Sequence, residues 1–538
     1  MAVIASIMIA GSAFGQSDQT EILHSPYGGQ IRALVIGIDA YQHVRQLKGA
    51  TADAQDIGTS LKRSGVRDVT TLLDGAADRT SVLSAIYELL QRTGSGDLII
   101  ISLAGHGAQE PEQESGGHNE GVENVFLLAG FEDSAEGSQQ RILGAEFNHF
   151  IKQFEEKGAH ILFVADTCYG GGMTRGIDPR WENMSFRHVP SYRLSDDALK
   201  PVATVRDESA TPFDFKHTVF LAAVDDKTMA PEIEIPGIPG FRGALSYAIA
   251  REIEGDSNTR GVDDKTTLRD LFGSVRQIVY QLSDERQNIV ATASPDESPT
   301  TVVFQHVRSI NVASSSVDAP APASAPASAD ERPIKIAALD GNSRDLAQLK
   351  PQQAPFKVVR PLDYPDLTWD PASHDVLAWG DVVAYAVDPG DLPSVIDRTK
   401  AVRDLKMMAD KTPQPIKVTP DDSLHHNSAV VHIEVSGVAG RALLLFDIAG
   451  DGSVELLYPV GADPHVIRTA DYVFPVRVQK PFGSDQLVAV TSPDPIPALE
   501  QALQKLDKRK ASVELVSMLK RYLPADARIG SAGLFTAP

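Results

Sequence analysis

Cysteine is almost missing from this chain, since Cys168 is the only one among 538 residues. A single thiol excludes any disulfide within the chain and any metal site built from several thiolates. Basic residues are also in deficit, because 50 Lys and Arg stand against 72 Asp and Glu, which gives a formal charge of −22. Such a charge repels nucleic acids and anionic lipids, so we expect neither as a partner. Long apolar runs are lacking too: no stretch reaches the roughly 18 to 20 residues that cross a bilayer, and we expect no membrane span.

The amino terminus is apolar, and no Lys or Arg precedes Arg32, so the usual basic leader is missing or the true start lies upstream. Residues 2–14 are apolar or small, and Ala13-Phe14-Gly15 has the small-x-small pattern that signal peptidase accepts. We interpret residues 1–15 as a signal peptide, which predicts a periplasmic or extracellular location. The alternative is a disordered or buried amino-terminal tail.

The length of the chain predicts two or three domains, because a single hydrophobic core does not grow to this size. Between residues 30 and 305, short β-rich runs alternate with helix-period segments, which is typical of an α/β unit with a largely parallel sheet flanked by helices. The expected strands are residues 32–36, 69–73, 97–102, 160–165, 217–223 and 301–304. The expected helices are residues 50–63, 80–91, 145–155, 243–254 and 267–281.

Residues 313–333 are rich in Pro, Ala and Ser and hold almost no large apolar side chain. Burial cannot offset their ordering entropy, so we expect a flexible linker. Beyond it, residues 340–525 are predicted to form a smaller α+β, β-rich accessory domain of unassigned role. Its expected strands are residues 430–435, 442–448, 454–458, 472–478 and 486–490, and its expected helices are residues 496–505 and 511–522.

Two expected strands run directly into a reactive residue that has glycine close by. One runs into Gly105-His106-Gly107 and the other into Asp166-Thr167-Cys168-Tyr169-Gly170. Because the carboxyl ends of parallel strands meet at one edge of a sheet, His106 and Cys168 are predicted to be neighbours. An adjacent imidazole raises the thiolate fraction of a cysteine and can protonate a leaving amine. Backbone N–H groups of Gly107 and Cys168 are expected to hold the oxyanion. Singly, a histidine or cysteine is more often structural, but together they predict a catalytic dyad.

Residues 30–305 resemble the caspase-like cysteine peptidases of clan CD, and most of all the bacterial metacaspases, or orthocaspases. The resemblance rests on residues 33–41, 47–54, 105–107, 166–170, 225–228 and 243–247, which follow the family's order and spacing. It implies a caspase-like, largely parallel six-stranded sheet, with Cys168 as the nucleophile and His106 as its proton-transfer partner.

The resemblance also implies an acidic substrate-binding pocket formed by Asp53 and Asp166, which would select Arg or Lys at P1, the residue before the cleaved bond. Two carboxylates facing a guanidinium give charge-assisted recognition, so the chemistry fits independently. Otherwise Asp166 would cap a turn and Asp53 would lie on a solvated helix face. No Arg stands at the matching pocket positions, which disfavours cleavage after Asp.

The sequence departs from the family's pattern at two places. Ala104 stands where metacaspases often have a serine, and Tyr169-Gly170-Gly171 replaces the common His-Ser-Gly. No cofactor is expected to be required, although the resemblance leaves calcium open. The candidate calcium ligands are the acids Glu120, Glu123, Glu132 and Asp133, and a solvated acidic loop is the alternative. No other metal site is predicted.

The leading hypothesis is therefore a cysteine endopeptidase acting on proteins or peptides with a basic P1 residue. Basic side chains in the polar stretch 174–216 predict self-processing there, because exposed loops are where nicking concentrates; they include Arg175, Arg180, Arg187, Arg193 and Lys200. One alternative is a non-catalytic caspase-like scaffold or sensor that binds protein partners through residues 340–538. Another is an esterase or peptide ligase, which would share the same acyl-enzyme.

Overall fold

The computed structural model describes residues 20–111, 122–168, 186–187, 215–224, 230–235, 238–255, 264–283, 287, 289–294, 296–309, 332–350, 354–378, 381–409, 411–420 and 424–538. The predicted signal peptide and nearly all of the predicted linker lie outside these residues. Within the described ranges, none of the helices has the length and apolar character that a membrane crossing requires.

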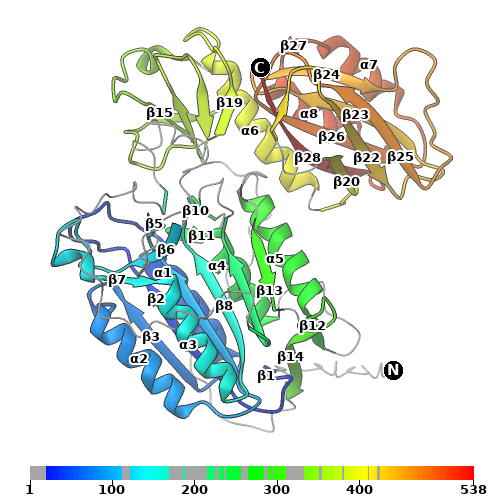
Figure 1. Ribbon diagram of the computed structural model, residues 1–538. Helices are drawn as coiled ribbons and strands as arrows, with labels where there is room; N and C mark the ends of the chain where they lie inside the picture. Colours follow the sequence, from blue (N-terminus) through cyan, green and yellow to red (C-terminus); the bar gives the residue numbers. More distant parts are fainter. Residues whose placement is uncertain are drawn as a thin grey trace, which may run out of the picture.

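The amino-terminal half is built on a six-stranded sheet in the order β3-β2-β4-β8-β9-β13 (Figure 1). Its strands are β2 (Ile31–Gly37), β3 (Asp68–Leu73), β4 (Leu98–Ala104), β8 (His160–Asp166), β9 (Thr218–Ala222) and β13 (Val290–Ala293). All neighbours are parallel except β9 and β13. Every residue of β4 is buried, because a central strand of a parallel sheet is covered on both faces. The predicted largely parallel six-stranded sheet is confirmed.

Helices cover both faces of this sheet (Figure 1). On one face, β2 residues Ala33 and Val35 share a core with α1 (Ala50–Arg63), α4 (Ala244–Glu254) and α5 (Leu268–Leu282). On the other face, the alternate β2 residues Leu34 and Ile36 pack with α2 (Arg79–Arg92) and α3 (Gly144–Glu156). The strand's period of two thus divides its apolar side chains between two cores.

One strand assignment from the sequence is wrong. Residues 301–304 were expected in the central sheet, but β14 (Val302–Ser309) pairs with β1 (Thr20–His24) and β12 (Lys265–Thr267) in a separate three-stranded sheet. The sixth central strand is β13, whose sequence is Val-Ala-Thr-Ala and whose residues are half-buried or exposed. A short edge strand of small residues lacks the apolar run by which a buried strand is found.

Two small sheets lie near the carboxyl ends of the central strands. One consists of β5 (Gly107–Pro111), β6 (Val122–Leu127) and β7 (Arg141–Leu143), and the other of β10 (Glu232–Glu234) and β11 (Phe241–Gly243). β5 begins at Gly107, directly after His106, and β11 leads directly into α4. Both small sheets therefore adjoin the edge where the reactive residues were predicted.

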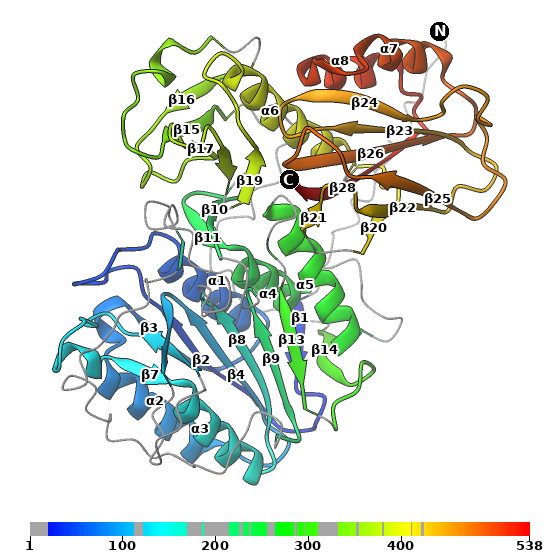
Figure 2. The same ribbon diagram turned by 45° about the horizontal axis from the view of Figure 1, so that its top comes forward.

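The carboxyl-terminal region, by which we mean the described residues from 332 onward, contains two further groups of strands (Figure 2). The first is a five-stranded sheet of β15 (Ile334–Ala338), β16 (Phe356–Val358), β17 (Leu367–Trp369), β18 (Val376–Ala378) and β19 (Asp381–Ala384), followed by α6 (Leu392–Ala409). The second group has a six-stranded sheet of β21 (His425–His426), β23 (Ala442–Ile448), β24 (Ser453–Tyr458), β26 (Ser484–Ser492), β27 (Arg509–Lys510) and β28 (Arg528–Ala537).

A three-stranded sheet of β20 (Ile416–Thr419), β22 (Val430–Ser436) and β25 (Asp471–Arg477) packs against the six-stranded sheet through a shared apolar core. The opposite face of the six-stranded sheet packs on α6, α7 (Pro497–Leu506) and α8 (Ser512–Tyr522). The predicted α+β, β-rich character of this part of the chain is confirmed, while its domain boundaries stay a prediction.

Candidate active site

His106 and Cys168 follow adjacent parallel strands. The last paired residues of β4 and β8 are Ala104 and Asp166, and each reactive residue stands two positions beyond its strand's member of that pair. The register therefore brings both to the same sheet edge, and both are fully buried.

His106 is held by one hydrogen bond from its imidazole and one from its backbone. Its Nε2 lies 2.7 Å from the carbonyl oxygen of Arg45, and its backbone N–H donates to the Tyr41 hydroxyl at 2.8 Å. A carbonyl oxygen can only accept, so Nε2 carries the proton and Nδ1 is the basic nitrogen of the neutral ring. Gly105 permits this arrangement, because a Cβ there would lie 2.6 Å from the Tyr41 hydroxyl oxygen.

The thiol of Cys168 is shielded from water. Its Sγ accepts a hydrogen bond from the Ala230 N–H at 2.8 Å and lies 3.6 Å from the Ala230 carbonyl oxygen. Burial raises the pKa of Cys168 to about 12, although the Ala230 N–H favours the thiolate. In this arrangement the thiol is neutral at pH 7.

Arg187 lies directly in front of the two reactive residues. Its carbonyl oxygen accepts hydrogen bonds from the backbone N–H groups of Gly107 at 3.3 Å and Cys168 at 3.4 Å. Its own N–H donates to the Ala230 carbonyl at 3.2 Å, and the preceding Phe186 forms an antiparallel bridge with Pro231. The two N–H groups predicted to hold an oxyanion therefore point at one peptide carbonyl of the same chain.

The side chain of Arg187 fills a pocket of three carboxylates, which we call the carboxylate pocket. Its guanidinium lies 2.5 Å from Asp53, 3.1 Å from Asp166 and 3.5 Å from Glu232. All four side chains are buried. Burial raises the pKa of Asp53 well above its ordinary value, and the Arg187 guanidinium opposes this rise. The structure thus brings the two predicted pocket acids together around a basic side chain and adds a third acid, Glu232, that sequence reasoning missed.

Backbone N–H groups fix the three carboxylates in place. Gly243 donates to both oxygens of Asp53 at 3.0 Å, and Ser246, in the first turn of α4, donates to Asp166 at 2.8 Å. Gly49 donates to Glu232 at 2.7 Å. A Cβ at residue 243 would lie 2.2 Å from an Asp166 oxygen, so only glycine fits there.

The carboxyl-terminal region reaches the carboxylate pocket through Tyr364. Its hydroxyl donates to Glu232 at 2.6 Å, and its ring packs on Phe241 with centroids 4.3 Å apart. The Nζ of Lys48 lies 4.4 Å from the centre of the same ring. Tyr364 therefore orients a pocket carboxylate from outside the amino-terminal half, and nothing in its sequence context indicated this contact.

Among the described residues, the acids considered as calcium ligands do not gather around one point. Glu120 and the side chain of Glu123 lie outside the described residues, while Glu132 and Asp133 are exposed and Glu132 contacts Ser134 and His43. Among the residues that the structure describes, one group of three side chains has ligand atoms close enough for a metal ion, and it consists of His160, His217 and Glu297. A calcium requirement stays a prediction.

In this α/β sheet, two adjacent central strands are followed by a histidine and a cysteine, and a buried acidic pocket lies beside them. This arrangement is that of a caspase-like class of protein. Residues 30–301 match the sequence profile of the peptidase C14 family, described as the caspase domain. The chain therefore belongs to the caspase-domain family.

Individual metacaspases are similar to part of this chain. Metacaspase-1 of Plasmodium falciparum is 30% identical over 285 residues, covering 50% of this chain and 41% of that protein. Metacaspase-7 of Arabidopsis thaliana is 28% identical over 150 residues, covering 26% of this chain and 35% of that protein. The chain thus spans less than half the length of either metacaspase. Among solved structures, caspase-1 of Spodoptera frugiperda is 12% identical, with 54% of this chain and 94% of that one covered and a TM-score of 0.30.

Proposed function

We propose that this chain is a cysteine endopeptidase that hydrolyses proteins or peptides after Arg or Lys. One observation carries the proposal: Arg187 lies as a substrate residue would lie before cleavage. Its carbonyl oxygen accepts from Gly107 and Cys168 while its guanidinium fills the carboxylate pocket.

The chemistry follows from these positions. The Cys168 sulfur attacks the carbonyl carbon, and its proton passes to Nδ1 of His106, whose Nε2 stays bonded to the Arg45 carbonyl. The N–H groups of Gly107 and Cys168 stabilise the oxyanion, each by about 2.7 to 4 kcal/mol if they act as such donors do elsewhere. His106 then returns the proton to the leaving amine, the C–N bond breaks, and water hydrolyses the thioester.

The carboxylate pocket accounts for selection of a basic P1 residue. Three acids within 3.5 Å of a guanidinium offer charge-assisted hydrogen bonds, whereas an aspartate in the same place would meet like charges. Arg187 could instead be a fixed wall of a basic pocket that selects acids. The hydrogen bonds to its backbone favour the substrate interpretation, since Arg187 must leave before another peptide can use the same N–H groups.

The proposal includes self-processing at the bond between Arg187 and His188. This bond lies within the stretch 174–216, most of which is outside the described residues. Until the bond is cut and Arg187 leaves, the chain blocks its own site, so cleavage is also the step that activates the enzyme.

We expect Arg187→Gln to slow self-processing by at least about tenfold, because a neutral amide forfeits the charge-assisted contacts to three buried carboxylates. The measurement is the appearance of two fragments on a denaturing gel over time. The Cys168→Ala chain, purified in the same way, serves as the reference that cannot process itself. Arg193→Gln is the matched control, since it removes another arginine from the same stretch, and it should process at the wild-type rate.

Equal fragmentation of wild-type and Cys168→Ala chains would mean that a contaminating protease cuts the stretch 174–216, and the proposal would then be wrong. Unchanged processing of Arg187→Gln would show that a different bond is cut.

A further inference from the structure

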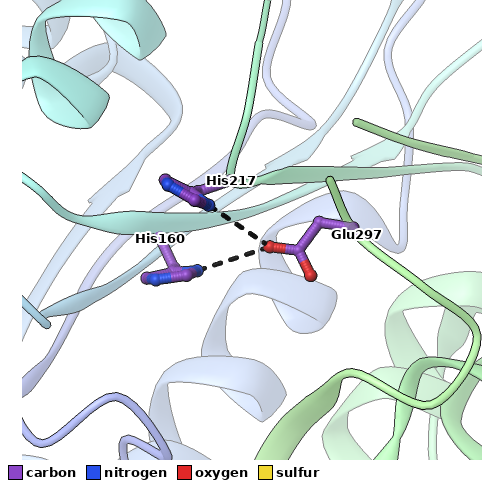
Figure 3. Close-up of side chains that lie close together, drawn as sticks. All are labelled: His160, His217 and Glu297. Carbon is purple, nitrogen blue, oxygen red and sulfur yellow. Dashed lines mark ion pairs between the residues drawn. The ribbon is translucent and has the colours of Figure 1, made fainter. Parts of the chain in front are cut away.

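A second cluster of reactive side chains lies at the opposite end of the central sheet from Cys168. His160 begins β8, His217 immediately precedes β9, and Glu297 lies in the turn that follows β13. Figure 3 shows that both imidazoles direct a nitrogen at the same oxygen of Glu297. Cys168 follows β8 at its other end, eight residues from His160, which is roughly 26 Å at the rise of an extended strand.

Both separations between these atoms are longer than an ordinary hydrogen bond, and they are ion pairs only when the imidazoles are protonated. Nδ1 of His160 lies 3.4 Å from Oε1 of Glu297, and Nδ1 of His217 lies 3.8 Å from the same oxygen. Hydrogen bonds from nitrogen to oxygen are normally about 2.7 to 3.2 Å long. The His160 nitrogen is buried, and no described residue offers it a hydrogen bond of acceptable geometry.

The His160–Glu297 separation is that of two ligands sharing a metal ion, and the His217–Glu297 separation of 3.8 Å exceeds it by a few tenths of an ångström. Bonds of about 2.0 to 2.1 Å in a tetrahedron place neighbouring ligand atoms about 3.3 to 3.4 Å apart. All three ligand atoms lie within 4.8 Å of one another, and Glu297 is only 4% exposed. Two imidazoles and a carboxylate are a ligand set that zinc commonly takes, with a water molecule in the fourth position.

Contacts around the cluster hold its members in place before any ion binds. Tyr27 stacks on the His160 ring at a centroid distance of 3.3 Å, and the rings of His160 and His217 lie 4.5 Å apart. Glu155 accepts the backbone N–H of His217 at 2.7 Å. Such outer contacts fix the orientation of the ligands, as they do in known metal sites.

We propose that His160, His217 and Glu297 bind one divalent transition-metal ion, with zinc preferred. The ion would join the beginnings of β8 and β9 to the turn after β13, and so tie together these three neighbouring strands at the end of the sheet opposite Cys168. The site is separate from the peptidase proposal, because no ligand touches the carboxylate pocket or the reactive residues.

The test uses the full chain carrying Cys168→Ala, which removes the only thiol and prevents self-processing. Zinc is titrated against a chromogenic chelator, and thermal unfolding is followed with and without zinc. We expect one equivalent of zinc to bind and the melting temperature to rise by several degrees, since an ion that binds the folded state stabilises it by mass action. Replacing zinc by cobalt should give the weak visible bands of a nitrogen and oxygen site.

His160→Ala, His217→Ala and Glu297→Gln are each expected to weaken zinc binding at least about tenfold. His217 is 40% exposed, so its variant should fold even if the other two do not. His465→Ala is the matched control, because His465 lies 3.9 Å from Glu500 without a second histidine, and it should leave zinc affinity unchanged. Absence of stoichiometric zinc in the Cys168→Ala chain, or zinc binding that survives His217→Ala and Glu297→Gln, would overturn the proposal.

Discussion

Cys168→Ala and His106→Ala are each expected to reduce peptide hydrolysis by a factor on the order of 10⁴ or more. The thiol supplies the electron pair and the imidazole moves the proton, so neither residue alone retains the reaction. For the same reason the double variant should be no slower than either single variant, because members of one catalytic unit are not additive. The measurement is kcat/KM on a fluorogenic peptide with Arg at P1.

His149→Ala is the control for this comparison, since His149 lies on α3 and contacts Gln153 rather than the proposed dyad. It should hydrolyse the peptide at the wild-type rate. Turnover that survives both Cys168→Ala and His106→Ala would exclude the dyad, and stepwise additive losses would show that the two residues act independently.

Asp53→Asn is expected to lower kcat/KM for a P1 Arg peptide by roughly 150-fold to 5,000-fold, because breaking a buried ion pair from one side costs about 3 to 5 kcal/mol. Asn keeps the shape of the side chain and an oxygen that can accept from Gly243, so the main change is the lost charge. Asp166→Asn should act in the same direction. The measurement compares self-processed chains on peptides that differ only in Arg or its neutral isostere citrulline at P1.

The preference for Arg over citrulline should narrow in Asp53→Asn and stay wide in Asp56→Asn. Asp56 lies on the same helix and pairs with Arg242 at 2.6 Å, but its side chain is 37% exposed, and exposed pairs contribute little. An equal loss on both peptides in Asp53→Asn would indicate damage to the fold of the pocket rather than loss of charge recognition.

The amino-terminal sheet could be predicted because its strands are continuous apolar runs. Residues 97–102 and 160–165 were expected as strands, and β4 and β8 span Leu98–Ala104 and His160–Asp166. Their parallel pairing followed from the helices between them, and the placement of the reactive residues at one edge followed from the pairing. In the carboxyl-terminal region, residues 430–435 and 442–448 were likewise expected as strands, and β22 and β23 span Val430–Ser436 and Ala442–Ile448.

The remaining parts of the site could not be predicted from the sequence, because they depend on contacts between segments that are far apart in the chain. Glu232 is one of many acids, and only the fold brings it to Arg187, 45 positions earlier. Arg187 is one of seven Lys and Arg residues in the stretch 174–216, and nothing in the sequence set it apart. Tyr364 and the five-stranded sheet around it lie in short segments of mixed composition that showed no clear period.

These contacts also connect the carboxyl-terminal region to the carboxylate pocket. Tyr364 holds Glu232, and Glu232 contacts both Arg187 and the backbone that leads into α1. Any movement of this region would therefore alter one wall of the carboxylate pocket.

The central claim of the proposed function is that Cys168 is a reactive thiol beside a pocket for a basic side chain. The most direct measurement treats the self-processed full chain with peptide acyloxymethyl ketones that carry Arg or Asp at P1 and locates the adduct by mass spectrometry. We predict a single adduct on Cys168 that forms far faster with Arg than with Asp. Faster labelling by the Asp compound, or no adduct on Cys168 with either, would contradict it.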